Sequence, residues 1–167
     1  MLAIITTLYD YNRWANQKVQ EAASQVGQQD FKASAGLSHD SLCGTLAHIL
    51  TAETVWRQRC QFGVSPPHLL TGDDFRDLES LRQKWLAEMD AWQAYIGGLS
   101  EADLQATVHY HTTRGAEHHD TLWPLLLHVV NHGTQFRSEA AVALTRLGHS
   151  PGDLDLLALL RSKQARN

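Results

Sequence analysis

Four stretches of this sequence repeat their apolar residues at intervals of three and four, the period that lines one face of an α-helix. Each stretch ends at glycine, which commonly terminates helices: Gly27, Gly63, Gly97 with Gly98, and Gly148. Four amphipathic helices bury their apolar faces most simply by packing against one another. The sequence therefore predicts an all-α fold, a four-helix bundle.

The helix ends and the connections follow from capping residues and prolines. We expect a first helix that ends at Gly27, a second from Asp40 or Ser41 to about Gly63, a third from near Asp73 to Gly97, and a fourth from near Asp120 or Thr121 to Gly148. The connection between the second and third helices contains two prolines and is long for a bundle. Before the fourth helix, alternating residues from Thr107 to His111 predict a short hairpin.

Length and charge restrict the class of protein. A chain of 167 residues with 43% hydrophobic residues can bury a core as one domain, which we assign to residues 1–167. The 14 basic and 18 acidic residues are scattered, so we expect no nucleic-acid partner. We find neither a signal-peptide pattern nor the roughly 20 consecutive apolar residues that span a bilayer. We therefore expect a cytoplasmic protein without a membrane partner.

The two cysteines lie on the same predicted helix. Cys43 and Cys60 would be about 25 Å apart along its axis, which is too far for a disulfide. We interpret both as small buried hydrophobic side chains in a reducing compartment, not as catalytic thiols.

Histidine is the unusual residue type, with ten copies. His128 and His132 are separated by about 40° around a helix, so they project from one face at the edge of the apolar stripe. His48 should point inward from the second helix, at the side of the core. Taken singly, these histidines also fit buried structural residues or a chance pair. Together, three neutral imidazoles predict an open divalent-metal site, for zinc or nickel first and for iron or manganese as alternatives.

Two glutamates lie on the same predicted helices as these histidines. Glu139 follows His132 by two turns and nearly in line, so we expect it to orient a ligand or a bound water. Glu53 points away from His48, and we expect an interhelical salt bridge there.

The predicted hairpin is rich in histidine. His109 and His111 share one face of a strand, and with His118 or His119 across the turn they could form a second metal site. The alternative interpretation is a solvated loop.

Four sequence blocks spread over nearly the whole chain carry a family resemblance. They are YNRWAN at residues 11–16, LAHILTAETVW around His48, LLLHVVNHGTQFR ending at Arg137, and LGHSPGDLDLL after the fourth helix. In these blocks, and in their order, the chain resembles the DinB family, damage-inducible-like bundles related to bacterial thiol-dependent transferases.

The resemblance implies a four-helix bundle with an up-down-down-up course, a long crossover between the second and third helices, and frequently a homodimer. It also implies a histidine triad, which corresponds here to His48, His128 and His132. Many relatives have a further histidine where this chain has Phe136, so a triad that used that position would be incomplete here. We keep His128 because its spacing from His132 suits a shared ion.

Two functions fit these residues. The first is a metal-dependent enzyme. The resemblance favours a thiol S-transferase that joins a low-molecular-weight thiol to a small electrophilic substrate, and a hydrolase that uses metal-bound water is the close variant. The second is a non-catalytic metal-binding stress-response or binding protein in which the ion ties two helices together. DNA repair has little support, because the chain is acidic and has no basic stripe.

Overall fold

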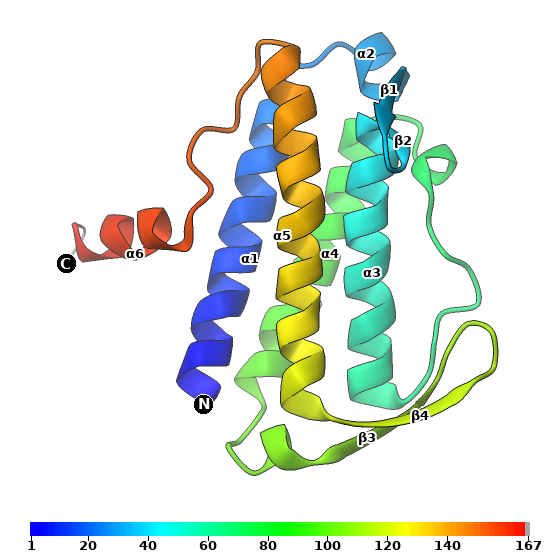
Figure 1. Ribbon diagram of the computed structural model, residues 1–167, viewed down its shortest axis with the longest axis vertical. Helices are drawn as coiled ribbons and strands as arrows, with labels where there is room; N and C mark the ends of the chain where they lie inside the picture. Colours follow the sequence, from blue (N-terminus) through cyan, green and yellow to red (C-terminus); the bar gives the residue numbers. More distant parts are fainter. Residues whose placement is uncertain (166–167) are drawn as a thin grey trace.

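Four long helices lie side by side in the computed structural model, which describes residues 1–165 (Figure 1). They are α1 (Leu2–Ala23), α3 (Leu42–Phe62), α4 (Leu78–Gly97) and α5 (Leu122–Arg146). Helices α1 and α3 each pack against both α4 and α5, so each helix has two neighbours around a common interior. The mainly helical prediction is confirmed. Among residues 1–165, no helix combines the length and the apolar character needed to cross a bilayer.

Short elements connect and extend the bundle. They are α2 (Gln28–Lys32), β1 (Ser34–Leu37), β2 (Asp40–Ser41), η1 (Gly72–Asp74), η2 (Asp103–Gln105), β3 (Thr107–His111), β4 (Glu117–Thr121) and α6 (Leu156–Gln164). Strands β1 and β2 form one small antiparallel sheet, and β3 and β4 form another. The predicted hairpin before the last bundle helix is therefore confirmed. The other short elements were not predicted, because a few residues show no measurable period.

Both observed ends of α3 match the predicted ends, whereas the observed start of α4 differs from the predicted one. The Ser41 hydroxyl accepts a hydrogen bond from the Gly44 N–H at 3.0 Å, and Gly63 ends the helix with φ of 71°. The expected start of the third long helix near Asp73 is wrong, because Asp73 lies in η1. Asp77 caps α4 instead: its carboxylate accepts a hydrogen bond from the Ser80 N–H at 2.8 Å.

A polar network crosses the interior of the bundle at Glu53. Its carboxylate accepts hydrogen bonds from the side-chain amides of Asn12 and Asn16 at 2.6 and 2.8 Å, and from the Trp85 indole at 2.7 Å. Arg137 donates to the oxygens of the same two asparagines at 2.5 and 2.9 Å. Glu53 and Arg137 are each only 1% exposed. The network therefore links all four long helices.

The salt bridge expected for Glu53 is replaced by this hydrogen-bonded arrangement. Within residues 1–165, no ion pair within 4.0 Å joins Glu53 to a basic residue, and the two asparagines separate its carboxylate from Arg137. Burial raises the pKa of Glu53, while the hydrogen bonds from Asn16, Asn12 and Trp85 and the charge of Arg137 oppose that rise.

We expect Glu53→Ala to lower the free energy of unfolding by about 3–5 kcal/mol, because it leaves three donors unpaired and the Arg137 charge uncompensated. Urea denaturation followed by circular dichroism measures the change. Glu21→Ala, an exposed change on α1, serves as the control and should stay within about 0.5 kcal/mol of the parent. A Glu53 variant as stable as this control would contradict the structural role.

Candidate functional site

A cavity of about 480 Å³ lies between α3, α5 and the connection that leads from α3 to α4. Residues 69–72 of that connection form one wall, and Thr113 of the hairpin turn borders the cavity. The Thr51 hydroxyl donates a hydrogen bond to the Leu70 carbonyl at 2.6 Å, which fixes the connection against α3. The cavity is therefore built from segments that are distant in the sequence.

One face of α3 supplies the longest wall of the cavity. His48, Ala52, Val55 and Arg59 follow one another at intervals of four, three and four residues, and all four border the cavity. This spacing places an imidazole at one end of the wall, apolar groups in the middle and a guanidinium at the other end.

His48 and His132 approach each other across this cavity. Their Nε2 atoms are 3.1 Å apart, one on α3 and the other on α5. Burial lowers the pKa of each imidazole to about 4, and the nearby His39 contributes in both cases. Both rings are therefore neutral at physiological pH, the form that binds metal ions.

His128 borders the same cavity one turn before His132, but its side chain is more exposed. The ring centroids of the two residues are 5.9 Å apart, and His128 meets the Trp56 ring edge-on at 4.9 Å. Partial burial lowers the pKa of His128 as well. Of the three histidines predicted from the sequence, His48 and His132 are in contact and His128 stands beside them.

His39 is a fourth cavity histidine, and the sequence did not predict it as a site residue. Its ring stacks on that of His48 with centroids 3.7 Å apart. The loop reaches α3 because Asp40 adopts a positive φ of 67° and because Gly44 has no side chain; a Cβ there would lie 2.0 Å from the His39 carbonyl oxygen. No periodicity marks such a loop, so only the fold reveals the position of His39.

Phe136 packs among these imidazoles. Its ring centroid lies 4.4 Å from that of His48, 4.7 Å from that of His132 and 5.3 Å from that of His39. It offers no donor atom to a metal ion, so any ligand beyond His48 and His132 must come from another residue of the cavity.

Glu139 contacts the loop that carries His39. Its carboxylate accepts a hydrogen bond from the Ser38 N–H at 2.6 Å. Within residues 1–165, no hydrogen bond joins Glu139 to a histidine. Its predicted part in orienting a ligand or a water stays a prediction.

Among residues 1–165, Arg59 is the only arginine or lysine that borders the cavity. Its Nε–H donates to the Ser65 hydroxyl at 2.8 Å, and its guanidinium lies 4.9 Å from the Trp56 ring centroid and 5.4 Å from that of Tyr110. It forms no ion pair within 4.0 Å with any carboxylate of the described chain. Arg59 was not among the predicted site residues, although it lies three turns after His48 on the same face of the helix.

Both cysteines are unpaired, as the sequence predicts. Burial raises the pKa of Cys60 to about 12 and also raises the pKa of Cys43. The thiolate form is therefore disfavoured at both positions.

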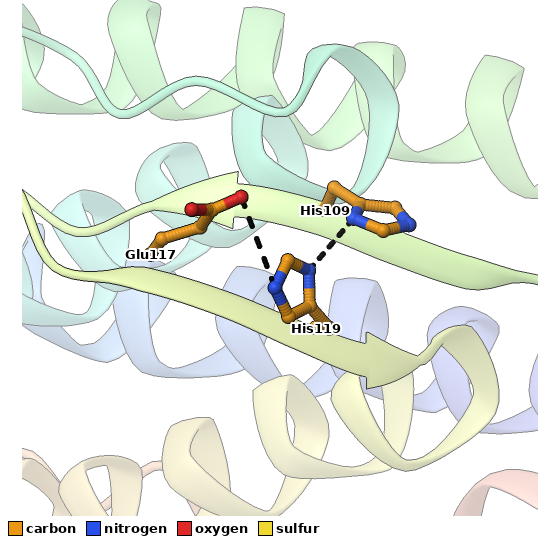
Figure 2. Close-up of side chains that lie close together, drawn as sticks. All are labelled: His109, Glu117 and His119. Atoms are coloured by element: carbon orange, nitrogen blue, oxygen red, sulfur yellow. Dashed lines mark hydrogen bonds and ion pairs between the residues drawn. The ribbon is translucent and has the colours of Figure 1, made fainter.

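A separate group of metal-binding residue types lies on the hairpin (Figure 2). His109 and His119 approach with their Nδ1 atoms 2.7 Å apart, and Glu117 lies 3.8 Å from Nε2 of His119. One donor atom from each residue lies within 4.8 Å of the others, an arrangement found nowhere else in residues 1–165. His118 points elsewhere and stacks on Tyr110.

Comparisons with known proteins agree with this fold. A model described as the DinB family matches residues 1–167. Protein DinB of Bacillus subtilis (strain 168) is 23% identical over 154 residues, which covers 89% of this chain and 88% of that protein.

Two solved structures are similar to this fold. A DinB family member from Shewanella denitrificans superposes with a TM-score of 0.59 and 19% identity, covering 94% of this chain and 89% of the other. A conserved protein from Enterococcus faecalis has a TM-score of 0.59 and 12% identity, covering 82% and 92%.

We expect the metal-free protein to titrate His48 and His132 near pH 4, because burial disfavours both charged rings. A lowered pKa means that the unfolded chain takes up protons first, so stability should be lost as the pH falls from about 6.5 toward 4. Histidine NMR titration after chelation measures both pKa values. Ordinary pKa values near 6.5 for His48 and His132 would contradict the buried geometry.

Proposed function

Because this chain belongs to the DinB family, we propose that it is a metal-dependent enzyme whose divalent ion binds in the cavity between α3 and α5. One observation carries this proposal: Nε2 of His48 and Nε2 of His132 lie 3.1 Å apart in a cavity that two further imidazoles border. Neutral imidazoles from two helices suit zinc or nickel, and also iron or manganese.

The third ligand has two candidates. His128 is the residue that its spacing predicts, and it borders the cavity one turn from His132. His39 is the alternative, because it stacks directly on His48. We propose that Glu139 acts as a positioning residue for this loop through its hydrogen bond to the Ser38 N–H.

The proposed reaction is thiol S-transfer. When bound, the ion would lower the pKa of a coordinated thiol or water. In the balanced reaction, the thiol sulfur forms a bond to carbon of the electrophile, the leaving group departs with its electron pair, and the thiol proton is released. Hydrolysis is the variant in which water replaces the thiol.

The walls of the cavity suggest how the two substrates bind. Val55, Trp56 and Leu69 provide apolar surface for an electrophile. Arg59 has no carboxylate partner in the described chain, so it is suited to bind an anionic group of the low-molecular-weight thiol. Both cysteines are disfavoured as thiolates, so the reacting thiol would come from a cosubstrate.

A non-catalytic metal protein is the second candidate. The observation that favours it is that His48 and His132 lie on α3 and α5, which pack directly against each other, so one ion would tie these helices together. Chelation separates the two functions, because a purely structural ion would be needed for the fold and would support no turnover.

We also infer the family's up-down-down-up helix course within a single domain of residues 1–167. The long connection between α3 and α4, interrupted only by η1, supports that course. The homodimer implied by the resemblance stays a prediction, which sedimentation of the purified chain would test.

Metal analysis of protein purified without a histidine tag tests the site. The measurements use a His119→Ala background, which removes the hairpin group. In this background we expect one ion per chain. Adding either His48→Ala or His132→Ala should abolish binding of that ion. Loss in either His128→Ala or His39→Ala identifies the third ligand. His149→Ala is the matched control outside the cavity. Full retention of the ion by both the His48 and the His132 variants would exclude the proposed site.

Substrate selectivity tests the role of Arg59. With an aryl halide as electrophile, we expect Arg59→Met to raise KM for 3-mercaptopropionate by about 10- to 100-fold, because one charge-assisted contact is lost. The KM for uncharged 2-mercaptoethanol and the metal content should stay unchanged. Equal effects on both thiols would rule out recognition of the carboxylate.

Turnover that chelation abolishes while the circular dichroism spectrum persists would support the enzyme over the structural alternative.

A further inference from the structure

We propose that the β3–β4 hairpin carries a second metal site, in which His109, His119 and Glu117 bind a divalent ion of the zinc class. This site is separate from the cavity, and it does not depend on the function proposed for His48 and His132. The three side chains lie on two strands joined by one turn, and all three are exposed (Figure 2).

The pairing of the two strands places the ligands on one face. His109 lies directly opposite His119, and His111 lies directly opposite Glu117. Because alternate residues of a strand share a face, all four side chains project from the same side of the hairpin. The register thus concentrates three imidazoles and one carboxylate on a small surface.

The distances are close to those that an ion requires. One donor atom of each proposed ligand lies within 4.8 Å of the others. Ligands of a tetrahedral zinc ion are about 3.3 Å apart, given zinc–nitrogen distances of about 2.0–2.1 Å. His119 uses one ring nitrogen toward His109 and the other toward Glu117, so binding requires its ring to turn. Exposure leaves room for that movement.

The backbone beneath these side chains is held in place. On the opposite face, buried Tyr110 meets the Trp56 ring at 5.7 Å, and its hydroxyl donates to Asp120 at 2.9 Å. The Ser65 hydroxyl donates to the His111 carbonyl at 2.6 Å. A site on rigid strands loses less entropy on binding than one on a mobile loop.

The donor set identifies the class of ion. Two histidines and one glutamate form the protein ligand set of an open zinc site, which leaves a position for water. His111, opposite Glu117, is available as a fourth ligand. Calcium and magnesium prefer oxygen ligands, so the two imidazoles argue against them.

An ion here would affect a segment that reaches the cavity. It would join His109 in the middle of β3 to Glu117 and His119 of β4. Thr113 in the turn between these strands borders the cavity. The second site would therefore fix the hairpin turn beside the first site without sharing a ligand with it.

Zinc titration by calorimetry tests the proposal in a His48→Ala/His132→Ala background, which disables the cavity pair. We expect one Zn²⁺ per chain, with binding weakened more than tenfold by His109→Ala and by His119→Ala. His118→Ala is the matched control, because His118 lies on β4 beside His119 but projects from the opposite face and stacks on Tyr110. No zinc binding in the background, or equal weakening by His118→Ala, would overturn the site.

A second measurement covers the case in which the double variant fails to fold. In the parent chain, added Zn²⁺ should shift the NMR signals of His109, Glu117 and His119 as one group, and His119→Ala should abolish these shifts while leaving those of the cavity histidines. If zinc shifts only the cavity signals, the hairpin site is excluded and the cavity site is retained. If zinc shifts only the hairpin signals, the hairpin site is supported and the cavity site is excluded.

Discussion

The buried carboxylate of Glu53 determines how the four long helices face one another. It joins α3 to α1 through Asn12 and Asn16 and to α4 through Trp85, while the same asparagines bind Arg137 of α5. A rotation of any one helix would leave a buried donor or acceptor unpaired, which costs more than most apolar rearrangements. The network therefore specifies one rotation for each helix, a requirement that apolar stripes alone do not impose.

This rotation also explains why two histidines meet. His48 precedes Glu53 by five residues, and His132 precedes Arg137 by five residues. Five residues turn a helix by about 140° beyond one full turn. His48 is therefore rotated from Glu53 by the same angle as His132 is rotated from Arg137. Because Glu53 and Arg137 both face the interior network, His48 and His132 are directed to the same groove between α3 and α5. The metal site proposed there is thus a geometric consequence of the buried polar network.

Regular periodicity made part of this structure predictable. The four long helices, the Ser41 cap, the Gly63 terminus and the hairpin all follow from local sequence signals. The start of α4 did not, because Thr71 and Asp74 close a separate short turn in η1 before Asp77 provides the cap. His39 could not be placed from the sequence either, since its position depends on the left-handed backbone of Asp40 and on the close approach that Gly44 permits. Such contacts between a loop and a helix have no period to detect.

The surroundings of Phe136 bear on the choice of the third ligand. Phe136 of α5 places an aromatic ring against both His48 and His132, and His39 lies against the same ring from the neighbouring loop. A metal site depends on the number and direction of its donors more than on which element supplies them. If His39 is the third ligand, the loop before α3 supplies an imidazole to the site that His132 of α5 and His48 of α3 begin. The hydrogen bond from the Ser38 N–H to Glu139 then ties that loop to α5, the helix that carries His132.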